Sequence, residues 1–217
     1  MRMRKKKHLD TRMEQCDSLL VTSPQELRGQ WLEQFKNNTA YGELDFNELH
    51  IELGCGKGRF IVDVAKESPD VLFIAIERIS NVLVAAMELV LQNKLNNVKF
   101  INGWVDDVGE FFAEKEVSQI YLNFCDPWPA NRHLRRRLTH QRFLDLYRNI
   151  LKEKGEIHFK TDNLPLFEYS LTEFSRCDFA LSEVSYNLHE HSPQGIMTDY
   201  EKRFHEQGLP IYRCVAV

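Results

Sequence analysis

The sequence predicts an α/β fold: a doubly wound, mostly parallel seven-stranded sheet with an antiparallel last strand. Short apolar runs alternate with helical patterns along the chain, as in parallel sheets with crossover helices. A glycine-rich segment joins the first apolar run to the following helical pattern. Only a polar segment, residues 188–208, separates the last two apolar runs, so a hairpin with a long loop is expected between them and the final strand is antiparallel.

The expected strands are short apolar runs bounded by polar or glycine residues. They lie at residues 49–53, 71–76, 98–102, 118–124, 156–161, 178–187 and 209–217. Helical patterns lie between them, at residues 58–67, 80–93, 106–115, 139–154 and 165–176. Gly155 follows the fourth of these helices and is expected to end it in the left-handed conformation.

A further helix is predicted ahead of the first strand. Ser23 has the place of an N-cap, Pro24 the first helical position, and Glu26 completes a capping box. The helix should run to about Lys36. We interpret residues 1–22 as a basic N-terminal tail and residues 23–217 as one domain, because 217 residues with 43% hydrophobic composition can bury one substantial core.

Composition also predicts the compartment. No apolar run reaches membrane-spanning length, and the N-terminus is charged where a signal peptide would be apolar. We therefore expect a cytoplasmic protein that does not contact a membrane. The cysteines are odd in number and form no C-x-x-C pair, which indicates neither a disulfide framework nor a metal site; they stand at positions 16, 55, 125, 177 and 214.

The formal net charge of -4 conceals two basic patches. Residues 1–12 carry six Lys or Arg against one acid, and residues 131–142 carry five Arg against none. Without these eleven cations and one anion, the chain has 17 basic against 31 acidic side chains. An acidic body with local basic patches is what a protein needs in order to hold a phosphate backbone at one place, although such runs can also be plain solvated surface.

The segment ELGCGKG, residues 52–58, follows the first expected strand and opens the next helix. Gly54, Gly56 and Gly58 allow a tight turn and a close backbone approach to a ligand. A dehydrogenase fingerprint would place its third glycine one position later, where Arg59 stands. The spacing with Glu52 in front resembles the loop of class I methyltransferases, which use S-adenosyl-L-methionine, and the predicted sheet has the same Rossmann-like plan. A plain strand-to-helix turn is the alternative.

Two further positions suit a nucleoside cofactor. Glu77 closes the second strand, where an acid can accept both ribose hydroxyls; it could instead cap the next helix. After the third strand, Asp106 or Trp104 stands where methyltransferases contact the adenine. Asp106 is the candidate if the loop carries a gap, and Trp104 if it does not.

The segment NFCDPWPANRHLRRRL, residues 123–138, places a carboxylate in a proline-aromatic frame beside a cationic run. Pro127 and Pro129 forbid continuation of the preceding strand, so Asp126 and Trp128 should lie just beyond its carboxyl end, where open α/β sheets bind ligands. Trp128 could equally be a core aromatic residue. The pairing of carboxylate and cations suggests chemistry on a polyanion.

With ELGCGKG, Glu77, DPWP-x-x-RH-x-x-RR, FKTDN and MTDYE in this order, the chain resembles the bacterial single-subunit tRNA (guanine-N7)-methyltransferases over nearly its whole length. The resemblance implies methyl transfer from S-adenosyl-L-methionine to N7 of a guanine in the variable loop of tRNA, at position 46. It implies no required protein partner, and a monomer or a homodimer.

The resemblance also assigns roles by position. Asp126 would be the catalytic residue. The cofactor would contact Glu52, Gly54, Gly56, Gly58, Glu77, Trp104 or Asp106, and Asp126. The tRNA would contact Trp128, Ala130, Arg132, His133, Asp162, Thr198, Tyr200 and Glu201. Two of these assignments have structural alternatives, since Asp162 could form an Asx-turn and T-x-x-E from Thr198 to Glu201 is a capping box that needs no ligand.

One position departs from the family pattern, because Ala130 stands where the family usually has lysine after DPWP. We expect weaker or re-routed tRNA contact there, with Arg132 and His133 close enough to supply charge. Alternative functions are a class I methyltransferase acting on another base nitrogen or on a small molecule, and a non-catalytic RNA-binding subunit of the same fold. Arg59 and the basic run disfavour an NAD-dependent oxidoreductase.

Overall fold

The computed structural model describes residues 8–36, 45–190 and 195–217. They belong to two compact units, Met1–Phe111 and Phe112–Val217. The strands of the first unit are β1 (Glu48–Leu53), β2 (Val71–Ile76) and β3 (Val98–Ile101), and its helical segments are α1 (Leu9–Gln15), η1 (Asp17–Leu19), η2 (Pro24–Leu27), α2 (Trp31–Phe35), α3 (Arg59–Glu67), α4 (Ser80–Gln92), η3 (Val105–Asp107) and α5 (Val108–Phe111).

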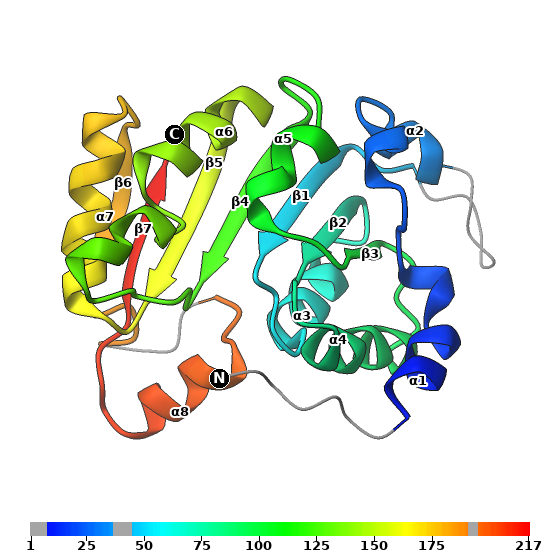
Figure 1. The fold of residues 1–217 in the computed structure, drawn as a ribbon. Coiled ribbons are helices and arrows are strands. Elements are labelled where there is room, and N and C mark those ends of the chain that lie inside the picture. Colours follow the sequence, from blue (N-terminus) through cyan, green and yellow to red (C-terminus); the bar gives the residue numbers. More distant parts are fainter. Residues whose placement is uncertain (1–7, 37–44, 191–194) are drawn as a thin grey trace. The chain divides into compact units, whose positions relative to one another are not determined.

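The second unit begins with the short connection to β4 (Val117–Asn123). Its other strands are β5 (Leu151–Thr161), β6 (Leu181–Ser185) and β7 (Tyr212–Ala216), and its helical segments are η4 (Asn131–Arg136), α6 (Gln141–Ile150), α7 (Leu164–Arg176) and α8 (Asp199–Glu206). Figure 1 shows α8 beyond the carboxyl ends of β4 and β5.

The predicted seven-stranded, mostly parallel sheet with an antiparallel last strand is confirmed. The strand order is β3-β2-β1-β4-β5-β7-β6. In the first unit β2 pairs in parallel with β1 and β3. In the second unit β4 and β5 are parallel, and β7 runs antiparallel to both β5 and β6.

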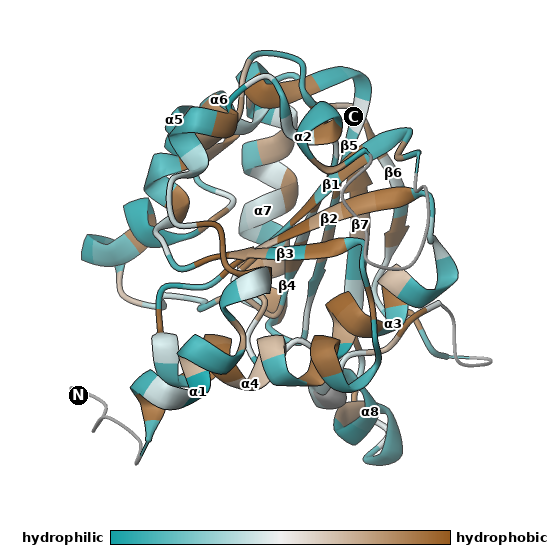
Figure 2. Ribbon diagram, turned by 90° about the vertical axis from the view of Figure 1, so that its right-hand side faces the viewer, coloured by the Kyte–Doolittle hydropathy of each residue, from teal (hydrophilic) through white to brown (hydrophobic). Residues whose placement is uncertain are grey.

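In the first unit the helices cover both faces of the three parallel strands. Figure 2 shows α1, α3 and α4 on one side of them, and α2 and α5 on the other. Every residue of β2 is buried, as expected for a continuous apolar strand between two helical layers. In the second unit α7 packs against β5, β6 and β7, and Asn163 caps its N-terminus by accepting a hydrogen bond from the backbone N–H of Leu166 at 2.9 Å.

The single helix predicted from Pro24 to about Lys36 is wrong. The segment forms the 3-10 turn η2 and then the separate helix α2, and the Ser23 side chain makes no capping hydrogen bond. Gly29 between them has a φ of 82°, a left-handed conformation that cannot continue a right-handed helix. Trp31 starts α2 fully buried, and its indole N–H donates to the carbonyl oxygen of Phe111 at 2.9 Å.

The helix predicted over residues 139–154 is shorter than expected. It ends at Ile150, and β5 starts at Leu151, which pairs with Val117 of β4. The left-handed residue is Lys154, with a φ of 62°, rather than Gly155. Gly155 lies inside β5, where a Cβ would stand 3.0 Å from Cδ2 of Leu151, so its role is close approach within the strand and not helix capping. Strand pairing overrides the helical pattern here.

The helix expected over residues 106–115 is confined to η3 and α5, which end at Phe111. Part of the expected tail is also built into the first unit. Arg12 of α1 forms an ion pair with Glu88 of α4 at 2.6 Å, and Leu20 forms a β-bridge with Phe100 of β3. Residues 1–7 lie outside the described residues, and the division at residue 22 stays a prediction. No helix in residues 8–36, 45–190 and 195–217 has the length and apolar character of a membrane span.

Candidate active site

The glycine loop follows β1 and is tied to the neighbouring strand. The backbone N–H groups of Gly54 and Cys55 donate to the carbonyl oxygen of Ile76 at the end of β2, at 2.8 and 3.2 Å. Gly56 and Gly58 have φ angles of 58° and 79°, which glycine adopts without the clash that a Cβ would cause. A Cβ on Gly56 would meet no atom within 4 Å, so the loop leaves open space beside its backbone.

The carboxylate of Glu77 faces this loop. Its Oε2 accepts a hydrogen bond from the backbone N–H of Gly56 at 3.3 Å, and its Oε1 accepts one from Ile79 at 2.9 Å. Asn102, directly after β3, donates to the Glu77 carbonyl oxygen at 2.8 Å and accepts from the hydroxyl of Ser80 at 2.8 Å. These bonds fix a half-exposed acid where the three parallel strands of the first unit end, which is where such sheets bind ligands.

A second acid of the first unit, Glu52, lies on β1 and is 3% exposed. The charges of Glu52 and Glu77 both affect the pKa of the neighbouring Cys55. Burial, followed by the negative charges of Glu52 and Glu77, raises the pKa of the Cys55 thiol well above its usual value. Cys55 is therefore a neutral thiol at physiological pH, which excludes it as a thiolate nucleophile.

The loop after β3 presents Trp104 at the surface. Its side chain is 55% exposed, and the guanidinium carbon of Arg78 lies 5.0 Å from the centroid of its ring. Arg78 directly follows Glu77 in the chain, so this cation–π contact brings Trp104 to the loop that carries the predicted ribose-binding acid. Asp106 lies further along in η3 and is exposed.

In the second unit the chain turns sharply at the end of β4. Phe124 and Trp128 have left-handed φ angles of 52° and 40°, so the segment between them leaves the strand direction, as Pro127 and Pro129 predict. Asp126 lies in this turn with its side chain exposed. Burial, followed by the charge of Asp126, raises the pKa of the adjacent Cys125 thiol to about 12.

A buried arginine holds this turn from behind. Arg137 is 7% exposed, and its Nε and Nη2 donate to the carbonyl oxygens of Pro127 and Trp128 at 2.9 and 3.3 Å. Its guanidinium also stands 4.3 Å from the centroid of the Tyr169 ring. Arg137 of the basic run therefore fixes the turn around Asp126 and is not available as a surface cation.

Two other side chains of the run contact Trp128. The Arg136 guanidinium lies 4.9 Å from the centroid of the Trp128 ring, and His133 makes an edge contact with that ring at 5.7 Å. Arg132 is exposed and its Nε donates to Nε2 of His133 at 3.2 Å. Ala130 is exposed at the start of η4. Trp128 is thus a half-exposed ring between a guanidinium and an imidazole, which disfavours its reading as a core residue.

Asp162, directly after β5, and Tyr200 of α8 lie together. The hydroxyl of Tyr200 donates to Oδ2 of Asp162 at 3.3 Å. The Tyr200 ring is 44% exposed; its centroid lies 4.6 Å from that of Phe204 and 5.1 Å from that of Phe124. Burial, followed by the charge of Asp162, raises the pKa of Tyr200. The phenol is therefore a neutral hydrogen-bond donor at physiological pH.

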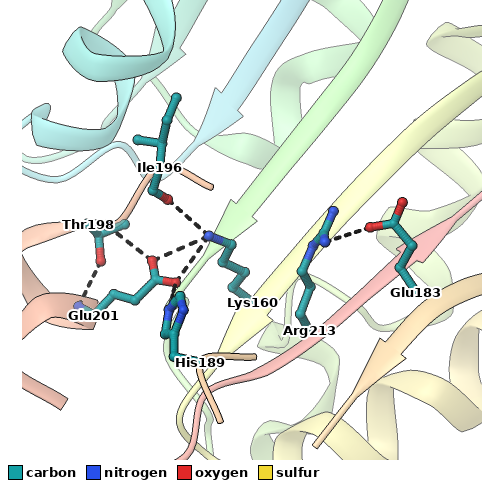
Figure 3. A network of polar contacts seen from close by, with 7 residues as sticks. All are labelled: Lys160, Glu183, His189, Ile196, Thr198, Glu201 and Arg213. Atoms are coloured by element: carbon teal, nitrogen blue, oxygen red, sulfur yellow. Dashed lines mark hydrogen bonds and ion pairs between the residues drawn. The ribbon is translucent and has the colours of Figure 1, made fainter. Parts of the chain in front are cut away.

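Thr198 and Glu201 form the predicted capping box. The Thr198 hydroxyl accepts from the Glu201 backbone N–H at 2.9 Å, and the Glu201 carboxylate accepts from the Thr198 backbone N–H at 3.1 Å. Glu201 is fully buried, with Lys160 and His189 as further partners (Figure 3). In this arrangement the Glu201 carboxylate has no surface to offer a substrate.

Comparison with known proteins decides the family. Residues 47–214 match a protein family described as "Putative methyltransferase". The chain is 44% identical over 218 residues to the tRNA (guanine-N(7)-)-methyltransferase of Geobacillus kaustophilus, covering 100% of this chain and 97% of that protein. It is 43% identical over 217 residues to the enzyme of the same name from Listeria monocytogenes, covering 100% and 98%.

The chain belongs to the tRNA (guanine-N7)-methyltransferase family. Solved structures agree on the fold. The 16S rRNA methyltransferase KamB superposes with a TM-score of 0.61 at 14% identity, covering 85% of this chain and 90% of that one. A SAM-dependent methyltransferase from Aquifex aeolicus gives 0.57 at 12% identity, covering 94% and 96%. The predicted class I methyltransferase fold is confirmed.

Within this tRNA (guanine-N7)-methyltransferase family member, each unit gathers a group of predicted residues. In the first unit Glu77 joins the glycine loop. In the second unit Trp128 joins His133, and Asp162 joins Tyr200. Several residues that hold these groups in place were not predicted from the sequence to have a role. They are Arg78, Phe124, Lys160 and His189, and some of them stand inside the motifs quoted above.

Proposed function

We propose that this chain transfers the methyl group of S-adenosyl-L-methionine to N7 of a guanine in the variable loop of tRNA, at position 46. The observation that carries the proposal is Asp126, an exposed carboxylate in a proline turn that buried Arg137 holds in place, beside exposed cations. The relatives that bear the name tRNA (guanine-N(7)-)-methyltransferase support the same reaction.

The first unit fits the proposed cofactor. Open space beside Gly54 and Gly56 admits a ligand against the backbone, and the fixed Glu77 carboxylate can accept both ribose hydroxyls. Glu52 would hold the amino acid part from β1, and the cofactor contact expected of Asp126 stays a prediction from the sequence. When bound, S-adenosyl-L-methionine supplies an electrophilic methyl group on a sulfonium. All remaining steps of the reaction depend on how the side chains orient the guanine.

Guanine N7 has an in-plane lone pair exposed in the major groove. It needs no deprotonation before it attacks a methyl group, so the site requires no strong general base. The chain has to orient the base, and such positioning can contribute roughly 7 to 11 kcal/mol of the barrier. Asp126 would accept hydrogen bonds from N1–H and the amino group of the guanine and oppose the positive charge that develops on the purine.

The second unit offers matching contacts for tRNA. Trp128 can stack on a base, and Arg132 and His133 supply charge next to Ala130. Asp162 and Tyr200 form a hydrogen-bonded pair with one exposed ring, and Thr198 lies at the start of the same helix. Direct contact of substrate with the buried carboxylate of Glu201 is the least supported of these assignments.

The decisive experiment uses unmodified tRNA and cofactor labelled on its methyl group. After incubation, nuclease digestion and nucleoside identification should yield 7-methylguanosine, and mapping should place it in the variable loop. A methyl group on another base nitrogen would favour the alternative methyltransferase. Absence of S-adenosyl-L-methionine binding in calorimetry would instead favour a non-catalytic RNA-binding subunit.

Trp104 and Asp106 can be separated by cofactor affinity. We expect Trp104→Ala to weaken S-adenosyl-L-methionine binding about tenfold, because loss of stacking on a nucleobase costs on the order of 1 to 3 kcal/mol. Asp106→Ala should leave affinity within about twofold. Calorimetry with each variant measures both values, and quenching of Trp104 fluorescence on cofactor binding gives a second readout. The reverse ranking would assign the adenine contact to Asp106.

Substitution of two adjacent arginines should affect different properties: Arg136 the binding of tRNA, and Arg137 the stability of the fold. The exposed Arg136 guanidinium lies over the Trp128 ring. Arg136→Ala should therefore raise the KM for tRNA and reduce by about one the slope of the logarithm of the tRNA binding constant against the logarithm of the salt concentration. Arg137→Ala should lower the unfolding free energy by about 1 to 3 kcal/mol, since it removes the partners of two carbonyl groups. Salt titrations of tRNA binding and urea unfolding of both variants test this. Equal effects of both changes on stability would contradict the division.

A further inference from the structure

Lys160 links two parts of the second unit. It is the penultimate residue of β5 and is 8% exposed. Its backbone carbonyl oxygen accepts the N–H of Phe124 at 2.9 Å. Its ammonium donates to Oε1 and Oε2 of Glu201 at 3.1 and 3.4 Å and to the carbonyl oxygen of Ile196 at 3.0 Å. One residue therefore holds both the turn after β4 and the start of α8.

Glu201 is the centre of this network (Figure 3). It is fully buried, and its carboxylate accepts from Lys160, from Nε2 of His189 at 2.8 Å, and from the Thr198 backbone N–H at 3.1 Å. His189 is itself 6% exposed and makes an edge contact with His205 of α8 at 5.3 Å. Three separate segments, at residues 160, 189 and 198, thus converge on one carboxylate.

The free-energy cost of burying the Lys160–Glu201 ion pair indicates that the pair has a structural role. Burial lowers the pKa of Lys160, while Glu201 acts in the opposite direction. A buried ion pair contributes little net stability compared with apolar packing, but loss of one partner leaves a costly unpaired charge. An isolated helix of eight residues, the length of α8, is not stable in water. The pair therefore serves to specify where α8 begins, which apolar packing alone would not define.

The consequence lies at the surface. Tyr200 precedes Glu201 in α8, and Asp162 follows Lys160 by two residues. The buried pair therefore sets the distance between the Tyr200 hydroxyl and Oδ2 of Asp162, which is 3.3 Å, and the contact of the Tyr200 ring with Phe124. A shift of α8 would separate these groups without altering either side chain.

We propose that Lys160 is a positioning residue for tRNA methylation, and that Glu201 acts through Lys160 and His189 and not by touching the substrate. The ammonium of Lys160 fixes the start of α8, and α8 in turn presents Thr198 and Tyr200 beside Asp162. This inference rests on the proposed function for its tRNA readout, but the placement of α8 can be measured independently.

The test compares Lys160→Met, Glu201→Gln and the double variant. Lys160→Met should raise the KM for tRNA about tenfold and leave the S-adenosyl-L-methionine dissociation constant within about twofold. It should also speed amide hydrogen exchange in α8 at least about tenfold. Glu201→Gln should show the same pattern, and the double variant should be no worse than the poorer single variant, because both residues act through one contact.

The matched control is Glu183→Gln, which breaks the ion pair between Glu183 and Arg213 on the neighbouring strands β6 and β7 (Figure 3). It should leave both the KM for tRNA and the exchange of α8 unchanged. If Lys160→Met does not fold, as judged by circular dichroism, Glu201→Gln decides alone, since it keeps the shape of the side chain and an oxygen acceptor.

Three results would overturn the inference. One is normal exchange of α8 in a folded Lys160→Met or Glu201→Gln variant. Another is a loss of turnover in Glu201→Gln with α8 exchange unchanged, which would indicate direct substrate contact. The third is additive effects of the two substitutions on the KM for tRNA. Failure of the parent protein to methylate tRNA would count against the proposed function instead. The exchange measurements would still test whether Lys160 and Glu201 fix the start of α8.

Discussion

Asp126→Asn should lower the turnover number for tRNA methylation by about 100- to 1,000-fold, similar to the cost of removing one preorganised hydrogen-bonding group at a reacting centre. Asparagine keeps the shape of the side chain but presents an amide N–H₂ where the carboxylate would accept from the guanine. It also removes the negative charge that opposes the developing charge on the purine. Single-turnover kinetics at saturating cofactor and tRNA measure the effect directly.

The fold should be unaffected, because Asp126 is exposed and Arg137 holds the surrounding turn through backbone carbonyl groups. Asp145→Asn, another exposed aspartate of the second unit, is the matched control and should keep normal turnover. Since Asp126 is also a candidate cofactor contact, the dissociation constant for S-adenosyl-L-methionine has to be measured for the same variant. Weaker cofactor binding with normal saturated turnover would reduce Asp126 to a cofactor ligand, and normal values of both would refute either role.

The fold could be predicted from the sequence because its signals are local. A continuous apolar run such as residues 71–76 has few alternatives to a buried parallel strand, and the glycine loop marks the start of a βα unit. Errors arose where strand pairing or a single backbone angle overrode the local pattern. The residues 151–154 have a helical pattern, yet Leu151 pairs with Val117, and Gly29 interrupts an apparently well-capped helix.

The candidate site, too, could be predicted from the sequence only in part. Its accessible members, such as exposed Asp126 and half-exposed Glu77, stand in short motifs at strand ends and could be found from sequence. The residues that support them pair over distances that no motif records. Lys160 and Glu201 are 41 residues apart in the chain. Arg137 is chemically identical to its neighbours in the basic run, and only its burial distinguishes a clamp from a surface cation.

Gly58→Ala should lower the unfolding free energy by about 2 to 4 kcal/mol, with roughly 1 to 2 kcal/mol from the left-handed backbone and a similar or larger amount from overpacking. Gly58 has a φ of 79°, and a Cβ there would stand 2.6 Å from Cβ and 2.8 Å from Cα of Ala86 in α4. Because α3 starts at the next residue, the clash has to be relieved by moving α3 away from α4. Urea unfolding measures the loss.

Gly56→Ala is the matched control, because its φ is also left-handed at 58° but a Cβ would meet no atom within 4 Å. It should cost only the backbone term of about 1 kcal/mol, and its main effect should be weaker S-adenosyl-L-methionine binding, since the new methyl group enters the open space beside the loop. Adding Ala86→Gly to Gly58→Ala should restore part of the lost stability and not all of it, because the Cα of Ala86 remains in place. Equal destabilisation by Gly56→Ala and Gly58→Ala would mean that backbone strain alone, and not the close approach of α3 to α4, requires the glycine. Gly56 and Gly58 would then differ only in their effect on cofactor binding, and Gly58 would have no packing role against α4.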